Sequence, residues 1–559
     1  MAIPQLGVRG RTGEASGERP LVKADVNSIG VVGLFARQFN ELMTVSAGRD
    51  FEWIAGGHNV DKSGRIQLDS LLKNARGTSL NLHIASWRAG DAAQAARELQ
   101  DATPAGTLRL RDAYRGKDSA GRWANDTGAR VRHATKVSTR VRGATAAAVT
   151  EVPVYSVQGI QLADIVVITH GGTDYPRKVT GINIGARSIM LDDATGHPAL
   201  EDGDAVQIRA FQLVAYRRDA NGVEQQVALP QNSEFLSLEP DHATDYAPTK
   251  LQNHPLFRGE DMASAANYVD RFPAEGRTYL QGGADGTPPA TVSDWASLQS
   301  RFAQVRLFAV INTDSQNADV HSSWRDWAMT RNDHPQYFGA LPFVGEDWQV
   351  LEDFAEPLLR PDGWNQLSLF YGYRYWADPT DAGPFGARQI SVHGAVLGAW
   401  MEIIYSGSAH LSLAEVQFSL LGFVPGGEEP PEDADSIETS MDGSATVRDR
   451  LYAKGVNLVR QYRGAIRVRS FRSMTEDQRY QDLHIHAISQ ILKFTAEDDL
   501  QDRENVPLKR AELERVVLRL GLQMLKPAHS GQFPPYFESQ SRRPGSGAFV
   551  DRDAEGNLL

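Results

Sequence analysis

The spacing of hydrophobic residues changes along this chain, and the changes divide it into blocks. An apolar run typical of a buried strand occurs at residues 29–34, and a further strand is expected at residues 80–87. Between about residues 150 and 240, strand-like runs such as 165–169 and 211–216 alternate with turns rich in Gly, Asp and Asn, which predicts an all-β segment. From Asp294 onward, strand-like and helix-like runs alternate, which predicts a parallel or mixed α/β layer. Further strands are expected at residues 107–113, 129–133, 188–191, 206–209, 305–311, 337–344 and 366–373.

Several expected helices follow a polar residue that is placed to cap them. Asp91 precedes the Ala-rich run 92–101, Ser293 precedes a run with Trp295 and Phe302, and Asp319 precedes a run with two tryptophans. A side-chain oxygen at such a position accepts a hydrogen bond from a free N–H at the helix start. We therefore expect helices at these three places, and a fourth at residues 347–359.

The segment from residue 457 to residue 526 predicts a compact α+β unit. In residues 463–472, Arg467 and Arg469 alternate with apolar residues, so a strand there has one basic face. Thr475 and Gln478 have the spacing of a capping box, which predicts a helix that carries an apolar stripe from Tyr480 onward. A second amphipathic helix is expected between Pro507 and Pro527, because proline is tolerated in a first turn and ends a helix elsewhere.

Composition limits the class of protein. With 559 residues, the chain is expected to form about three or more domains. It has no cysteine, which excludes disulfides, thiolate metal sites and cysteine nucleophiles. No apolar stretch is long enough to span a bilayer, and the first residues lack a signal-peptide pattern. We expect a globular product of a bacterial-type cytoplasm, with no membrane insertion.

Charge is unevenly distributed along the chain. The net charge of −12 argues against general nucleic-acid binding. Residues 448–526, however, contain sixteen Lys and Arg against eleven Asp and Glu, whereas residues 428–442 contain seven acids and no base. Two interpretations remain open: a solvated face beside an acidic linker, or a basic surface that meets an acidic protein partner.

The motifs of common enzymes do not occur in the sequence. There is no Gly-x-Ser-x-Gly, no P-loop and no Gly-x-Gly-x-x-Gly. His170 and the two glycines after it are interpreted as a turn. His484 and His486 lie two positions apart on an expected helix and point to different faces, so we interpret them as surface residues without a shared metal. We expect no catalytic residue, no cofactor and no metal.

One polar cluster follows an expected strand at the place where α/β sheets often bind ligands. It consists of Asn312, Asp314, Asn317 and Asp319. Oxygen ligands of this kind suit a divalent cation, but the same residues also form ordinary caps and turns. We favour caps and turns.

Several short motifs resemble those of contractile tail sheath proteins, which occur in phages, R-type pyocins and type VI secretion systems. Proteins of this family typically begin with a Gly-Val arm, followed by a Gly-rich apolar strand and then a segment from Phe to Gly. The same three features occur in this order at residues 6–8, 29–34 and 51–57. Gly121, Trp123 and Asn125 match a Gly-x-Trp-Gly-Asn turn, with Ala124 in place of the second glycine. Near the C-terminus, Asn457, Gly464 and Arg472 fall at the expected places, although residues 470–473 replace the usual Trp-Gly. The small-residue apolar helix of the family corresponds to residues 389–398.

The resemblance implies a fold class and a division into domains. The expected fold is α+β and multidomain, with a mixed α/β core, an inserted all-β domain, a C-terminal α+β domain and extended terminal arms. The division is an N-terminal arm at 1–25, a core domain at 26–100 and 255–425, an inserted β-rich outer domain at 101–254, an acidic linker at 426–446, a tube-facing domain at 447–526 and a C-terminal arm at 527–559.

The resemblance also implies a function. Such subunits polymerise as stacked hexameric rings around a tail tube and contract to drive the tube through the host envelope. The implied partners are further copies of the chain, the tail tube protein, and baseplate and tail terminator proteins, in a virion tail assembled in the bacterial cytoplasm. The alternatives are another phage tail or baseplate structural protein, and an α/β-type hydrolase on residues 294–400.

Two sets of interface residues follow from these expectations. The tube-facing interface is assigned to Arg463, Arg467, Arg469 and Arg472. The strands that the arms add to neighbouring subunits are assigned to Leu6, Gly7, Val8, Ala548, Phe549 and Val550, because main-chain pairing persists while domains move rigidly.

Overall fold

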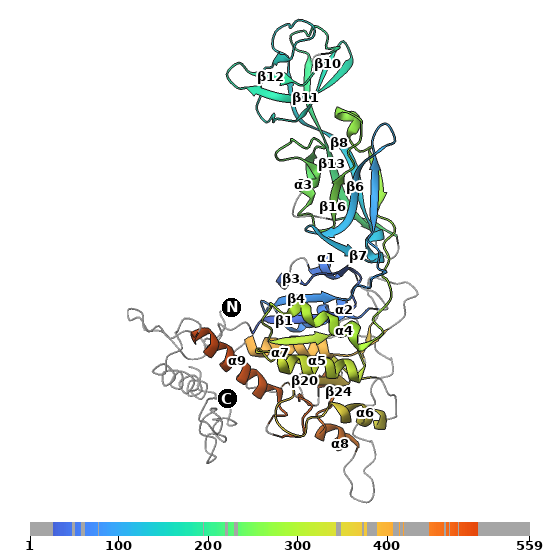
Figure 1. Cartoon of the computed structure of the whole chain (residues 1–559), viewed down its shortest axis with the longest axis vertical. Coiled ribbons are helices and arrows are strands. Elements are labelled where there is room, and N and C mark those ends of the chain that lie inside the picture. The colour runs from blue at the N-terminus through green and yellow to red at the C-terminus, as the bar shows by residue number, and fades with distance from the viewer. Residues whose placement is uncertain are drawn as a thin grey trace, which may run out of the picture.

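A computed structural model of the chain describes most of its residues (Figure 1). The described ranges are 26–46, 51–57, 62–76, 78–193, 195–218, 222–227, 233–342, 348–371, 374–376, 388–405, 413, 417–418, 447–462, 465–468, 470–478 and 480–500.

A nine-stranded mixed sheet forms the lower part of the molecule in Figure 1. Its strands from β4 to β24 run parallel, whereas β3, β25 and β23 are antiparallel to their neighbours. In order across the sheet, the strands are β23 (Gln417–Phe418), β25 (Ala465–Val468), β24 (Asn457–Tyr462), β20 (Leu367–Tyr371), β19 (Gln336–Ala340), β18 (Ala309–Asn312), β1 (Ser28–Gly33), β4 (Asn81–Ser86) and β3 (Met43–Ser46).

Helices cover both faces of this sheet, because its central strands are apolar on both sides. Ile29 and Val31 of β1 pack in one hydrophobic cluster with α2 (Gly64–Asn74), α7 (His393–Tyr405) and α9 (Leu483–Leu500). Val32 packs in the cluster on the opposite face. Strands buried on both faces are the mark of parallel sheets between helix layers. The helical elements on that opposite face are α4 (Val292–Ser297), η3 (Leu298–Phe302), α5 (Ala318–Thr330), α6 (Trp348–Ala355), η4 (Glu356–Leu358) and α8 (Val447–Ala453).

A second nine-stranded sheet is entirely antiparallel and lies in the upper part of Figure 1. Its long strands β8 and β13 extend towards the tip formed by β10, β11 and β12. The strands are β17 (Gly276–Tyr279), β8 (Thr127–Arg140), β13 (Ala205–Arg218), β10 (Ile165–His170), β11 (Thr173–Asn183), β12 (Ser188–Leu191), β9 (Glu151–Pro153), β14 (Glu224–Gln226) and β15 (Ser233–Leu236).

A five-stranded antiparallel sheet lies between the two large sheets in Figure 1. It contains β16 (Phe257–Asp261), β6 (Gly106–Tyr114), β7 (Lys117–Ala120), β2 (Gln38–Phe39) and β5 (Ala96–Gln100). The remaining elements are β21 (Arg374–Trp376) paired with β22 (Arg388–Ile390), α1 (Phe51–Ala55), α3 (Ala247–Leu251), η1 (Arg122–Asp126) and η2 (Tyr268–Arg271). Strand pairing in this β-rich part includes β2 and the strands from β5 to β17, a wider span than residues 101–254, and the division into domains stays a prediction.

The mixture of helices and several sheets agrees with an α+β multidomain fold. The strands expected from continuous or alternating apolar runs are present as β1, β4, β6, β8, β10, β12, β13, β18, β19 and β20. In the part of the chain that the structure describes, no helix is long and apolar enough to cross a membrane.

The prediction of a helix at residues 92–101, after Asp91, is wrong. The Ala-rich segment instead forms β5, which pairs with β6. The Asp91 carboxylate accepts hydrogen bonds from the main-chain N–H and the hydroxyl of Thr287. Helix propensity in this segment is weaker than the gain from burying Leu99 beside the neighbouring strand.

Two helix caps lie near their expected positions but use other residues. The cap of α4 is Thr291, whose side chain accepts a hydrogen bond from the main-chain N–H of Asp294. The cap of α5 is Asn317, whose Oδ1 accepts from the N–H groups of Asp319 and Val320. Ser293 and Asp319 lie in the first turns instead, because the extended backbone that marks a cap occurs two residues earlier, at Thr291 and Asn317.

Candidate assembly surface

The hairpin of β24 and β25 extends the parallel sheet at one of its ends. β24 pairs with β20 in parallel and then turns back into β25, with Arg460 opposite Arg467. β23 contributes two residues to the outer side of β25, where Gln417 lies opposite Arg467. Among the described residues, β23 is the last strand of the sheet, and its outer edge has no partner.

Asn457 fixes the hairpin to the main sheet. Its buried amide Nδ2 donates hydrogen bonds to the carbonyl of Leu369 on β20, at 3.0 Å, and to the carbonyl of Arg472, at 2.8 Å. Its Oδ1 accepts from the main-chain N–H of Arg472 at 2.8 Å. A buried amide with these partners is costly to misplace. Asn457 is the first residue of β24.

Arg472 makes contacts within its own subunit. Its guanidinium stacks on the Tyr452 ring at 3.5 Å, donates a hydrogen bond to the Tyr452 hydroxyl, and donates another to Gln481 Oε1 at 2.7 Å. Arg467 is half-buried on β25. The other predicted interface residues, Arg463, Arg469, Leu6, Gly7, Val8, Ala548, Phe549 and Val550, lie outside the described residues, as does the expected second helix.

The capping box predicted at Thr475 is wrong. Thr475 is buried and its hydroxyl donates to the carbonyls of Arg360 and Gly363. Gln481 Nε2 donates to the Thr475 carbonyl at 2.8 Å, so the segment folds as an anchored loop. The helix, α9, therefore begins at Leu483.

The interpretation of His484 and His486 as surface residues is also wrong, because both are buried. His486 Nε2 lies 3.1 Å from the Tyr480 carbonyl, and its ring meets the Trp364 ring edge-on at 4.0 Å. Burial lowers the pKa of His486 to about 3, so the ring is neutral at physiological pH. This histidine supports packing of α9.

The polar cluster after β18 forms turns and caps, as favoured from the sequence. Asn312 Oδ1 accepts from the N–H groups of Asp314 and Ser315. Asp314 accepts from the N–H groups of Leu34, at 2.8 Å, and Ser63, at 2.6 Å, which joins two distant loops. Main-chain donors thus occupy its carboxylate oxygens. The motif His170-Gly-Gly forms the tight turn between β10 and β11, as expected.

A charged cluster that the sequence did not indicate lies in the β-rich part. Asp164, His242 and Asp245 bring ligand atoms within 4.8 Å of one another. Lys136 Nζ lies among them, 2.7 Å from Asp245 Oδ2 and 3.2 Å from Asp164 Oδ1, and Lys250 contacts the other Asp245 oxygen. Although burial opposes it, these lysines lower the pKa of Asp245. The ammonium group takes the position of a cation, so the cluster is an ion-pair network.

Comparisons with known proteins found similar chains among the solved structures. No family model and no curated protein matches the chain. Its structure is similar to the sheath tail protein of Desulfitobacterium hafniense, with 11% identity, a TM-score of 0.47, and coverage of 92% of this chain and 89% of that one. It is also similar to the helical sheath of the anti-feeding prophage in the contracted state, with 14% identity, a TM-score of 0.29, and coverage of 44% and 62%.

A third similar structure is the sheath complex, also in the contracted state, of an extracellular contractile injection system. Here the identity is 9%, the TM-score is 0.30, and 41% of this chain and 59% of that chain are covered. These three structures are described as sheath proteins, and two baseplate structures of the anti-feeding prophage are also similar to this chain.

Proposed function

We propose that this chain is the structural subunit of a contractile phage tail sheath. In this role it polymerises as stacked hexameric rings around a tail tube and contracts to drive the tube through the host envelope. Its partners are other copies of itself, the tube protein, and baseplate and terminator proteins. The role is structural and non-enzymatic, in a virion tail that is assembled in the bacterial cytoplasm.

The observation that carries the proposal is the sheet edge beyond the β24–β25 hairpin, where β23 is the last strand in the described part of the chain. An exposed edge presents main-chain groups that readily pair with a strand from another chain. Among the residues that the structure describes, β23 pairs with two positions of β25, and Asn457 fixes the hairpin to the main sheet. A strand added here by a neighbouring subunit is therefore joined to a rigid body, as a mesh that transmits force requires.

The proposal assigns a part to each predicted domain. In this proposal the mixed sheet with its helices is the core, the β-rich part that projects from it is the outer domain, and the end of the core built by residues from 447 onward faces the tube. The terminal arms, at 1–25 and 527–559, are the segments that add strands to neighbours. On contraction, each body moves rigidly while the added strands stay paired.

Electron microscopy of the purified full chain tests this proposal. We expect tubes of uniform width in negative stain, and their absence at high protein concentration contradicts the proposal. Discrete particles of fixed size favour the alternative, a baseplate component, because only a sheath forms an open helical polymer.

Deletion of the arms provides the matched variants. Removal of residues 1–20, or of everything after Ser530, should leave a folded monomer that no longer polymerises. Circular dichroism and the thermal midpoint serve as controls for folding. If either deletion unfolds the subunit, that segment belongs to its own core and the arm assignment is wrong.

A further inference from the structure

The β-rich part contains an opening between two strand edges that is closed at both ends. β5 and residues 270–284 run side by side and bond to each other at two places. At one end of the opening, Ala96 and Gln281 donate to each other's carbonyls, at 2.9 and 3.0 Å. At the other end, the N–H of Ala274 donates to the Gln100 carbonyl at 2.8 Å. Because main-chain hydrogen bonds close both ends, the opening suits a compact molecule and not a strand.

The two segments that border the opening differ in length. On β5, residues 97–99 lie between the two bonded positions, whereas residues 275–280 lie between them on the facing segment. The longer segment contains β17, which pairs with β8 in the other sheet. It therefore bows away from β5 and leaves space between the two edges.

Main-chain groups of both segments face the opening. In an antiparallel pair, alternate residues direct their N–H and C=O groups to opposite edges. Ala96 and Gln100 point away from β6, so Glu98 between them does the same. Leu280 donates to β8, so Arg277 points away from β8. Within the described residues, no main-chain hydrogen bond joins Glu98 to Arg277 across the opening, so these groups can bond to a ligand.

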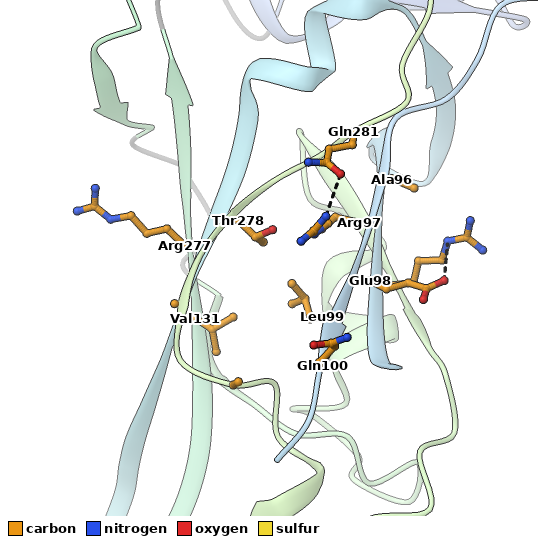
Figure 2. A pocket seen from close by; sticks show the side chains of 12 residues that line it. Ala96, Arg97, Glu98, Leu99, Gln100, Val131, Arg277, Thr278 and Gln281 are labelled. Atoms are coloured by element: carbon orange, nitrogen blue, oxygen red, sulfur yellow. Dashed lines mark hydrogen bonds and ion pairs between the residues drawn. The ribbon is translucent and has the colours of Figure 1, made fainter. Parts of the chain in front are cut away.

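A pocket of about 630 Å³ occupies the opening, which is within the size range of small-molecule sites. Figure 2 shows Leu99, Val131 and Thr278 directed into it. Leu99 and Val131 are buried and form an apolar floor, whereas Thr278 brings a hydroxyl. Such a lining matches a hydroxylated ring, because the flat side of the ring carries C–H groups and its edge carries hydroxyls.

The free charge of the pocket belongs to Arg97. Its Nη1 donates to the neutral Gln281 Oε1 at 2.9 Å, and within the described residues no carboxylate pairs with it. The two other arginines that line the pocket have carboxylate partners: Arg109 pairs with Glu98, and Arg277 pairs with Glu224. Figure 2 shows Glu98 on the opposite side of β5 from Arg97. The Arg97 guanidinium is therefore the group that meets an anionic ligand.

We infer that this pocket binds a sugar acid, a hydroxylated six-membered ring that carries one carboxylate. The carboxylate meets the Arg97 guanidinium, whose planar N–H groups match its geometry. The ring lies on Leu99 and Val131, and its hydroxyls bond to Thr278 and to the main chain of Glu98. One free cation among several neutral donors and acceptors favours a ligand with one carboxylate and several hydroxyls over a polyanion. The inference does not rest on the proposed sheath function.

A matched pair of glycosides tests this inference on the full chain. The probes are methyl β-D-glucuronide and methyl β-D-glucoside, which differ only by a carboxylate in place of a hydroxymethyl group, titrated by saturation-transfer difference NMR. We expect the glucuronide to bind about tenfold more tightly than the glucoside. The Arg97→Gln variant should abolish this difference, whereas Arg258→Gln, on β16 of the same five-stranded sheet, should preserve it.

A third probe, free D-glucuronate, distinguishes two sources of the ligand. The methyl group of the glucuronide occupies the position through which a sugar joins a polysaccharide. Binding of the glucuronide at least as tightly as the free acid therefore supports a sugar acid that is linked in a polysaccharide. Tighter binding of the free acid supports a free sugar acid.

A second variant fills the pocket without disturbing the fold. A Cβ at Gly276 meets nothing within 4 Å, and Gly276 lies opposite Val131 on the face that points into the pocket. The Gly276→Phe variant should therefore keep the thermal midpoint of the wild type and bind none of the three probes. Equal affinity of the two glycosides for the wild type, unchanged binding to Gly276→Phe, or no saturable binding of either acid up to ~10 mM each overturns the inference.

Discussion

Arg37 and Asp112 form an ion pair of 2.7 Å in which both side chains are completely buried. Arg37 lies just before β2, whereas Asp112 is on β6. The same guanidinium donates to the Ser119 hydroxyl and to the main-chain carbonyls of Trp53 and Leu256. Burial lowers the pKa of Arg37, but its acceptors keep the charge compensated. This arginine therefore fixes the five-stranded sheet to the segments that lead from the mixed sheet.

The first prediction concerns this pair. Replacing Asp112 by Asn should lower the free energy of unfolding by about 3–5 kcal/mol, because the buried guanidinium then lacks a counter-charge. The matched control is Glu41→Gln, which removes the exposed partner of Lys117 and should cost at most about 1 kcal/mol. Denaturation in guanidinium chloride measures both. If Asp112→Asn lowers the free energy of unfolding by less than ~1 kcal/mol, the pair does not hold the five-stranded sheet to the segments that lead from the mixed sheet.

The second prediction concerns acid stability. Burial lowers the pKa of His254, His393 and His486 to about 3 and that of His321 to about 4. The unfolded value is about 6.5, so the unfolded chain binds these protons first. The stabilisation is therefore complete above about pH 6.5 and is lost as the pH falls towards the folded values.

In that pH window, each of these histidines should add up to about 1.4 kcal/mol per pH unit to the slope of the free energy of unfolding against pH. Unfolding free energies measured at intervals between about pH 7.5 and 4.5 give the total slope. His254→Gln should reduce it, because the Nδ1 of His254 accepts only main-chain N–H groups, which a Gln oxygen replaces. A stability that stays flat down to about pH 5 contradicts the prediction.

Strands with uninterrupted apolar runs were predictable from the sequence, because a strand that is buried on both faces needs apolar residues at successive positions. β1 and β10 are of this kind. β5 was not predictable, since its strand form depends on pairing with β6 and not on its Ala-rich composition. Local propensity is overridden in such cases by contacts that only the folded chain provides.

The candidate site was predicted only in part for a similar reason. The alternation of Arg467 with apolar residues indicated a strand correctly, and β25 contains it. Thr475 has the spacing of a cap, yet its hydroxyl bonds to residues more than a hundred positions away in the sequence. The burial of His486 likewise depends on Trp364. Sequence spacing carries no information about such distant partners.

The third prediction concerns the close packing of α2 on α7. A Cβ at Gly398 would lie 2.1 Å from the Leu71 carbonyl oxygen, which is main chain and cannot move alone. Gly398→Ala should therefore separate the two helices and cost about 1–3 kcal/mol. Gly90→Ala is the control, because its Cβ meets nothing within 4 Å, and it should change stability by at most about 0.5 kcal/mol. Equal stabilities of the two variants contradict the packing argument.

The last prediction concerns the basic strand, and it rests on the proposed sheath function. We expect the face of Arg467 and Arg469 to meet an acidic surface of the tube protein in the extended state. Partly exposed ion pairs contribute about 0–1 kcal/mol each, but repetition over every subunit sets the register of assembly. Reversing both residues to Glu should stop assembly on tubes and spare tube-free polymers, which electron microscopy distinguishes. Arg472→Gln is the contrasting variant, because Arg472 bonds to Tyr452 and Gln481 within the subunit, and it should lower subunit stability instead. If the double reversal unfolds the subunit, or if assembly with and without tubes is equally affected, the basic strand serves its own domain and not the tube.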